Sequence, residues 1–202
     1  MKVVRVNHKK GERPKINLTV RRVESSVWWS MQFHKSHYLT ADMNKSCKCL
    51  LFEWNGIPVG FVGILNSPRK GIPYSCSVSR IVILPDFQGL GLSTVIFNFI
   101  GGIVKSLSNE TDDYRLYIKT AHRKFGEALG RNPNVRATMF DGKGRNEKDT
   151  AHDIHKYRNR LKRVSYCKEY VGKTIDGYQC LLKPIKEMRE DKKNKSNETS
   201  QQ

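Results

Sequence analysis

The most informative run of this sequence is Ser79-Arg80-Ile81-Val82-Ile83-Leu84-Pro85-Asp86-Phe87-Gln88-Gly89-Leu90-Gly91-Leu92-Ser93. A β-branched apolar run ends at a proline, a glycine-rich loop follows, and an apolar helical pattern then covers residues 94–104. A strand, a tight loop and a helix in this order present unpaired backbone N–H groups to an anion at the positive end of the helix. Glycines let the backbone approach a phosphate, because a Cβ there would collide with it. The run therefore predicts a phosphate-binding loop.

The spacing within this loop narrows the class of ligand. The nucleotide pattern G-x-x-x-x-G-K-S/T needs a lysine that is missing here, and the dinucleotide pattern G-x-G-x-x-G would place its third glycine at Thr94. Gln88 to Ser93 instead match Gln/Arg-x-x-Gly-x-Gly/Ala, with a serine as the last small residue. This pattern resembles the acetyl-CoA pyrophosphate loop of the GNAT superfamily of N-acetyltransferases. The alternative is a glycine turn that merely links a strand to a helix.

Further secondary structure is predicted along the rest of the chain. The patterns predict strands over 16–23, 48–54, 57–65, 75–84, 114–120, 163–171 and 178–182, and helices over 27–38, 94–106 and 122–129. Asn55-Gly56 predicts a hairpin, because both residues tolerate positive φ. The resulting order β-α-β-β-β-α-β-α-β-β resembles the GNAT fold over residues 16–185. That resemblance implies an α/β (α+β) protein with a mixed, twisted central sheet of about 6–7 strands flanked by helices. It also implies that strands 75–84 and 114–120 splay apart to form a cofactor cleft.

Composition bounds the class of protein. The 202 residues suffice for one domain with a sizeable core. No apolar run approaches the ~20 residues of a membrane span, so we expect no membrane partner. Five cysteines without a disulfide spacing pattern predict a reduced, intracellular and most simply cytoplasmic protein. The sequence leaves monomer and homodimer open.

The charge is strongly positive. Lysine and arginine number 37 against 19 acidic residues, a formal net charge of +18. Such a field attracts polyanions without specifying a sequence, as in ribosomal proteins and enzymes that modify tRNA or DNA. The alternative is a generally basic, solvated surface. We expect the positive charge to serve a nucleic acid through Arg158, Arg160, Lys162 and Arg163.

The domain organisation follows from these patterns. We expect a basic N-terminal extension over 1–15 and a single domain over 16–185, with a basic loop insertion at 141–162. The tail over 186–202 is too polar to bury enough area to offset its ordering entropy, and we expect it to be disordered.

The resemblance to GNATs also implies a donor site. It makes acetyl-CoA the acyl-donor cosubstrate and implies transfer of an acyl group other than aminoacyl. The exposed backbone edge of Ile81 and Ile83 would hold the pantetheine amides, and a backbone N–H of the same strand would polarise the thioester carbonyl. The pyrophosphate would lie in a cradle formed by Gln88, Gly89, Leu90, Gly91, Leu92 and Ser93.

Acid–base residues are less clearly marked. Many GNATs place a tyrosine acid in the helix after the fifth strand, where this sequence has Phe125. His122, just before that helix, is the substitute we predict, and an ordinary surface histidine is the alternative. Glu53 is a second candidate unless it points to water. His34 and His37, expected on one helix face, do not form a zinc spacing with the Cys-x-Cys of Cys47, so we predict no metal site.

Three residues suggest the acceptor side. His37-Tyr38 and Arg80 resemble a His-Tyr pair and an arginine of phage Mom-type proteins, which modify adenine in DNA. We therefore predict His37, Tyr38 and Arg80, with His122, as catalytic residues. The leading hypothesis is acetyl transfer from acetyl-CoA to an amine acceptor that is associated with nucleic acid. The alternatives are a Mom-like, phage-like DNA-base modification enzyme and a catalytically inactive GNAT-fold protein that binds nucleic acid.

Overall fold

The computed structural model of the chain describes residues 16–37, 42–143 and 164–183. Its strands are β1 (Thr19–Val23), β2 (Lys48–Trp54), β3 (Ile57–Asn66), β4 (Ser75–Ile83), β5 (Arg115–Thr120), β6 (Val135–Ala137) and β7 (Tyr166–Tyr170). The α-helices are α1 (Val27–Ser30), α2 (Leu92–Lys105) and α3 (Arg123–Gly130), and the 3₁₀ turns are η1 (Phe33–Ser36), η2 (Pro85–Phe87) and η4 (Gln179–Leu182). Several predictions fall outside the described residues, namely those for 1–15, Tyr38, 144–163 and 186–202.

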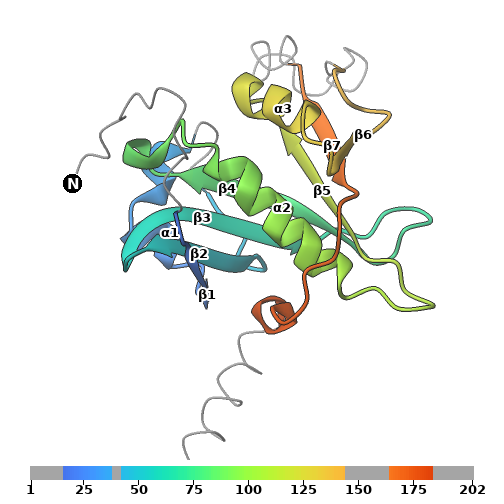
Figure 1. Cartoon of the computed structure of the whole chain (residues 1–202), viewed down its shortest axis with the longest axis horizontal. Helices are drawn as coiled ribbons and strands as arrows, with labels where there is room; N and C mark the ends of the chain where they lie inside the picture. The colour runs from blue at the N-terminus through green and yellow to red at the C-terminus, as the bar shows by residue number, and fades with distance from the viewer. Residues whose placement is uncertain (1–15, 38–41, 144–163, 184–202) are drawn as a thin grey trace, which may run out of the picture. The chain divides into compact units, whose positions relative to one another are not determined.

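The strands form one mixed sheet in the order β1-β2-β3-β4-β5-β7-β6 (Figure 1). β4 and β5 are parallel, whereas β1–β2, β2–β3, β5–β7 and β6–β7 are antiparallel. The mixed α/β fold predicted from the sequence is therefore confirmed. Two compact units divide the chain within β4: residues 1–65, 79–93 and 177–202 form the first, and residues 66–78 and 94–176 form the second.

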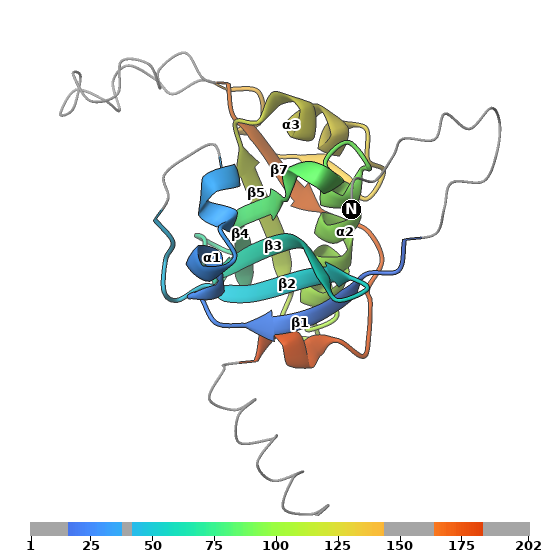
Figure 2. The same ribbon diagram turned by 90° about the vertical axis from the view of Figure 1, so that its left-hand side faces the viewer.

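In the first unit, β1, β2 and β3 lie side by side, with α1 beside them (Figure 2). The predicted Asn55-Gly56 hairpin is present, and both residues have positive φ, 51° and 77°. Phe61 of β3 lies at the centre of the apolar core, 5.4 Å from the rings of both Trp28 and Phe33. Trp28, Phe33 and Phe61 are all fully buried. Burial of this area, at about 25 cal/mol per Å², holds the short α1 and η1 segments on the strands.

The predicted helix over 27–38 is wrong in its length. α1 ends at Ser30, and η1 begins two residues after Met31. The chain turns at Gln32, whose φ of 58° is left-handed and cannot continue an α-helix. His37 follows η1 with an extended backbone. The expectation that His34 and His37 share one helix face is therefore wrong.

In the second unit, small residues let helices approach the strands closely. Gly101 of α2 faces the ring of Tyr170, and Gly126 of α3 faces the ring of Tyr166, so closely that a Cβ at either glycine would overlap the ring. α3 lies beside β5 and β7 (Figure 1). α2 begins at Leu92, two residues before its predicted start.

The C-terminal part of the fold corrects two further predictions. The predicted strand over 178–182 is wrong: Gln179–Leu182 form the 3₁₀ turn η4, with bonds such as Leu181 N–H to Tyr178 O at 3.0 Å. Leu181 and Leu182 are both buried, which a strand with one covered face could not achieve for neighbouring residues. The sheet nevertheless has seven strands, because it contains β6, which pairs with β7 and was not predicted. Its three residues are too few to show an alternating pattern.

Candidate functional site

β4 pairs with β5 along only part of its length. The parallel ladder joins Ser75–Val78 to Arg115–Ile118, whereas β4 continues to Ile83. The backbone of residues 79–83 therefore extends beyond this ladder. An early end to the ladder is what the predicted splay of these two strands requires.

A turn at the end of β4 orients the glycine loop. Pro85 opens η2, where its fixed φ suits the first helical position. Phe87 is 7% exposed and packs edge-on against Trp54, with 6.3 Å between ring centroids. The side-chain amide of Gln88 donates to the carbonyl oxygen of Ile83 at 2.8 Å. These contacts tie the start of the loop to the end of the strand.

The loop itself has the backbone of an anion cradle. Gly89 and Gly91 have φ of 82° and 78°, in the left-handed region that favours glycine. α2 begins directly afterwards, at Leu92. Among the described residues, none accepts a hydrogen bond from the backbone N–H groups of residues 89–93. These donors stand at the positive end of a helix.

The position of a Cβ at Gly91 is not occupied by any other described residue. An ideal Cβ built on Gly91 would have no described heavy atom within 4 Å. The positive φ therefore explains the glycine, and packing against the described residues does not. Unclaimed N–H groups, a helix start and open space fit the diphosphate of acetyl-CoA.

Arg80 is held by two backbone carbonyls. Its Nη1 donates to Ser79 O at 2.8 Å and its Nη2 to Asp42 O at 2.7 Å. The guanidinium thus links β4 to the segment that precedes β2. These two contacts fix the position of the Arg80 guanidinium beside β4.

Two buried thiols lie in the same unit as Arg80. Burial raises the pKa of Cys47, although the Ser79 hydroxyl and the Arg80 charge oppose the change. Burial raises the pKa of Cys49 to about 12. Both groups are therefore protonated thiols at neutral pH and poor nucleophiles. All five cysteines lie in described residues, and none forms a disulfide.

Two candidate catalytic residues, His37 and Glu53, each contact other side chains. The His37 ring packs edge-on against the buried Trp28 ring at 5.6 Å. Glu53 does not point freely to water: it accepts two hydrogen bonds from Arg21, at 3.0 and 3.2 Å, and its side chain is 15% exposed. A carboxylate paired in this way has its lone pairs directed to a guanidinium, which makes Glu53 a weak candidate for a general base.

His122 belongs to the second unit and is the N-cap of α3. Its Nδ1 accepts a hydrogen bond from Phe125 N–H at 3.2 Å. With Nδ1 as the acceptor, the neutral ring carries its proton on Nε2. That tautomer offers a hydrogen-bond donor at Nε2, whereas the predicted role as an acid would need the doubly protonated ring, in which Nδ1 could not accept from Phe125 N–H.

Comparison with known proteins rests on structure. No family model and no curated protein matches the sequence. The ribosomal-protein-S18-alanine N-acetyltransferase of Escherichia coli matches with a TM-score of 0.52 and 10% identity, covering 80% of this chain and 97% of that chain. The IAA acetyltransferase of Bacillus cereus matches with 0.52 and 13%, covering 76% and 97%. A GNAT-family acetyltransferase of Streptococcus pneumoniae matches with 0.51 and 15%, covering 77% and all of that chain.

This chain has the GNAT fold. The whole length of these smaller proteins matches, so the likeness covers the complete fold and is not confined to the glycine loop. In the GNAT fold of this chain, the loop lies between β4 and α2, as the sequence predicted. The resemblance to Mom-type proteins rests on His37, Tyr38 and Arg80, and it stays a prediction.

Two contacts of the GNAT-fold loop were missed from the sequence. The Gln88 side chain is tied to Ile83 O, and Phe87 is anchored on Trp54. The apolar character of Phe87 was the available signal for the second contact, and nothing in the sequence indicated the first. The described residues contain no group of three or more potential metal ligands. Among the helices of the described part, none is long and apolar enough to cross a membrane.

Proposed function

We propose that this chain is an acetyl-CoA-dependent N-acetyltransferase. The observation that carries the proposal is the row of unclaimed N–H groups at residues 89–93, with open space at Gly91 and α2 starting behind it. A catalytically inactive scaffold would have no physical need for two left-handed glycines at this place. The GNAT fold supports the proposal without specifying the reaction.

The chain's own residues would bind the donor mainly through backbone groups. The N–H groups of Gly89, Gly91 and their neighbours would bind the pyrophosphate, and the backbone of Ile81 and Ile83 would bind the pantetheine amides. Ile83 O already accepts from Gln88 at 2.8 Å, which leaves one lone pair of this carbonyl for a ligand amide. Gln88 would therefore position the loop and would not contact phosphate through its side chain.

Acetyl-CoA, when bound, supplies an acetyl group activated as a thioester, which an amine nitrogen takes up as the CoA thiol leaves. The amine must be neutral to present a lone pair. A fixed guanidinium nearby disfavours the ammonium form, and Arg80 would have this effect on an acceptor close to β4. His37 would line the acceptor side. The proton that the amine loses would end on the CoA thiol, and His122 Nε2–H would donate a hydrogen bond to the departing sulfur.

The acceptor we propose is an amine on, or bound to, nucleic acid. The net charge of +18 supports this choice, because it would raise the local concentration of a polyanion. Mom-like modification of a DNA base is the second candidate, favoured by His37 and Arg80. An acceptor screen with acetyl-CoA that includes tRNA, DNA and small amines distinguishes these reactions by the mass added to each.

Binding of acetyl-CoA to Gly91→Glu tests the proposal by calorimetry. The substitution sets a side chain and a negative charge into the anion cradle, so we expect binding to be abolished. Gly56→Glu is the matched control, because Gly56 has nearly the same φ (77° against 78°) and also no described atom within 4 Å of an ideal Cβ.

Both variants force a left-handed residue and should lose a similar ~1–2 kcal/mol of stability. The control should bind acetyl-CoA as the unmodified chain does. If Gly91→Glu keeps its affinity, the assignment of the loop is wrong. If both variants lose binding equally, strain and not the cradle is responsible.

A further inference from the structure

The second unit presents one face of its sheet opposite to its helices. Tyr166 and Tyr170 of β7 point toward α3 and α2. Glu169 lies between them in the strand, so it points to the other face. The register places Tyr117 of β5 and Arg136 of β6 directly opposite Glu169, and residues opposite one another share a face.

This face is covered by arginines in fixed positions. Arg136 Nη2 contacts one oxygen of Glu169 at 2.8 Å, and Arg115 Nη1 contacts the other at 3.7 Å. The Arg69 guanidinium stacks 3.7 Å from the centre of the Tyr117 ring. We call Arg69, Arg115 and Arg136 the arginine face. Tyr117 and Glu169 beneath it are both less than 9% exposed.

Arg136 and Arg115 both contact Glu169 and remain partly exposed to solvent. The side chain of Glu169 is 10% exposed, whereas that of Arg136 is 62% and that of Arg115 is 37% exposed. A guanidinium has five N–H donors, and Arg136 directs one to Glu169. The carboxylate therefore helps to orient two cations, of which Arg115 is also bound by Asp113, through Nε at 2.7 Å, and Arg136 is the more exposed. Orienting them in advance lowers the entropy cost of binding an anion.

The local charge is positive. Besides the arginine face, Lys119 points to the same side, because it lies opposite Cys167, two residues from Glu169. These four cations outnumber the two carboxylates in contact with them, Glu169 and Asp113. The site is thus complementary to an anion.

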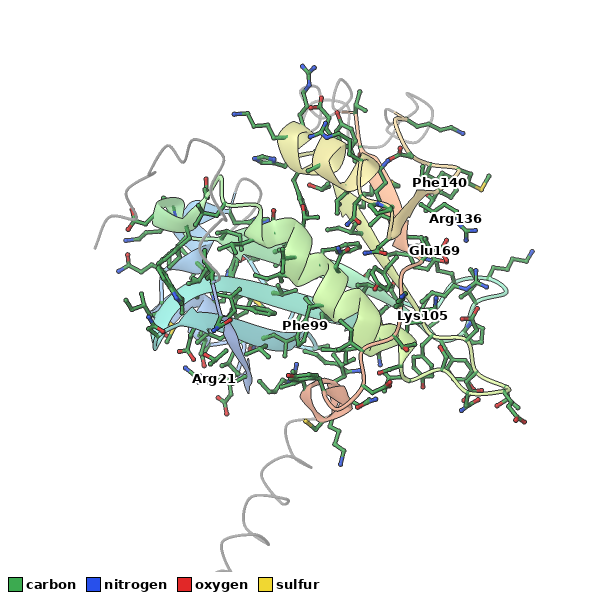
Figure 3. The ribbon with its side chains drawn as sticks, in the orientation of Figure 1. Arg21, Phe99, Lys105, Arg136, Phe140 and Glu169 are labelled. Atoms are coloured by element: carbon green, nitrogen blue, oxygen red, sulfur yellow. The ribbon has the colours of Figure 1, made fainter. Side chains whose placement is uncertain are left out.

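The second unit also carries an exposed aromatic residue that follows Arg136 closely in the sequence. Phe140 is 58% exposed in the turn after β6, four residues beyond Arg136, and Figure 3 labels both side chains. The next residue, Asp141, fixes this turn: its carboxylate accepts from Cys167 N–H at 2.8 Å and from Lys168 Nζ at 2.6 Å. These two hydrogen bonds therefore hold the turn that carries the Phe140 ring.

We propose that the arginine face and Phe140 bind single-stranded nucleic acid. The guanidinium groups contact phosphates, and the Phe140 ring stacks on an unpaired base. Arginine next to an exposed aromatic ring is the combination that single strands need, because a duplex keeps its base faces covered. The inference stands on the second unit alone and does not depend on acetyl-CoA binding.

Fluorescence anisotropy with labelled 16-nucleotide poly-dT and poly-U oligomers tests the proposal on the full chain. Phe140→Ala should weaken binding roughly 30-fold, the middle of the range for loss of one stacked base. Arg136→Gln should weaken it and lower the slope of log affinity against log salt by about 0.7, the value for one single-strand phosphate contact. A labelled duplex of the same length should bind with no effect of Phe140→Ala.

Arg123→Gln is the matched control. Arg123 lies in α3, on the helix-covered side, and is also an exposed arginine paired with a glutamate, Glu127, at 2.7 Å. It should change neither affinity nor slope. The proposal is overturned if Phe140→Ala and Arg136→Gln bind the oligomers as Arg123→Gln does, because the bound surface then lies elsewhere. It is also overturned if poly-glutamate competes as well as poly-dT, because charge alone then explains binding.

Discussion

A methyl group added at Gly101 tests how closely α2 packs on β7. An ideal Cβ there would overlap the Tyr170 ring, reaching its Cδ1 at 2.6 Å. Such a contact does not occur in folded proteins, so the helix or the ring must move. The ring has little freedom, because it is 7% exposed and its hydroxyl donates to Lys173 O at 2.8 Å.

The expected change in the free energy of unfolding for Gly101→Ala is the sum of three contributions. Overpacking costs about 1–3 kcal/mol, and loss of the Tyr170 hydroxyl bond costs about 1 kcal/mol. Alanine in place of glycine inside a helix stabilises the helix by about 1 kcal/mol, which offsets part of this loss. Gly101→Ala should therefore destabilise the protein by about 2 kcal/mol. For a chain of this size, that lowers Tm by roughly 4–8 °C.

Urea and thermal denaturation followed by circular dichroism measure this change. Gly130→Ala is the control, because its Cβ would meet Lys168 Nζ at an ordinary 3.7 Å, and it should be neutral or stabilising. In a Tyr170→Leu background the ring is gone, so Gly101→Ala should become neutral or stabilising. If Gly101→Ala is as stable as the unmodified protein, or if its effect persists with Tyr170→Leu, the packing argument is refuted.

Three further predictions concern the site and the buried charges. His37→Ala and Arg80→Ala should each lower turnover while acetyl-CoA affinity, measured by calorimetry, stays near that of the unmodified chain; a parallel loss of affinity would contradict their place on the acceptor side. Asp141→Asn should cost about 3 kcal/mol in urea denaturation, because it leaves Lys168, whose side chain is 7% exposed, without its carboxylate; a loss below 1 kcal/mol would show that the pair is well solvated. Burial raises the pKa of Cys49 from 9.0 to about 12, so its contribution to stability is full below pH 9 and is lost as pH rises toward 12. Cys49→Ala should therefore flatten the fall of the urea midpoint above pH 9, and an unchanged pH profile would refute this.

The conformation of the glycine loop was predictable because its signals are local. Pro85, Gly89 and Gly91 set their own backbone angles, and the loop has the φ values those residue types imply. The β2–β3 hairpin was predicted for the same reason, since Asn55-Gly56 dictates the turn.

The failed predictions lie where local signals compete with packing. The run from Val27 has helical character, yet Gln32 turns left-handed so that both Trp28 and Phe33 can pack against Phe61. Residues 178–182 are apolar enough for a strand, but burying Leu181 and Leu182 together selects a 3₁₀ turn.

Residue identity alone thus settled the order of the elements from β1 to α3 and the conformation of the glycine loop, because turn residues and apolar periodicity act within a few neighbouring positions. Tertiary structure decided which side chains meet. Gln88 ties the loop to Ile83, and Glu169 gathers Arg115 and Arg136 from two other strands. The two contacts of Glu169 join residues that are 33 and 54 positions apart, so they depend on strand register, and register is set by the packing of the whole sheet.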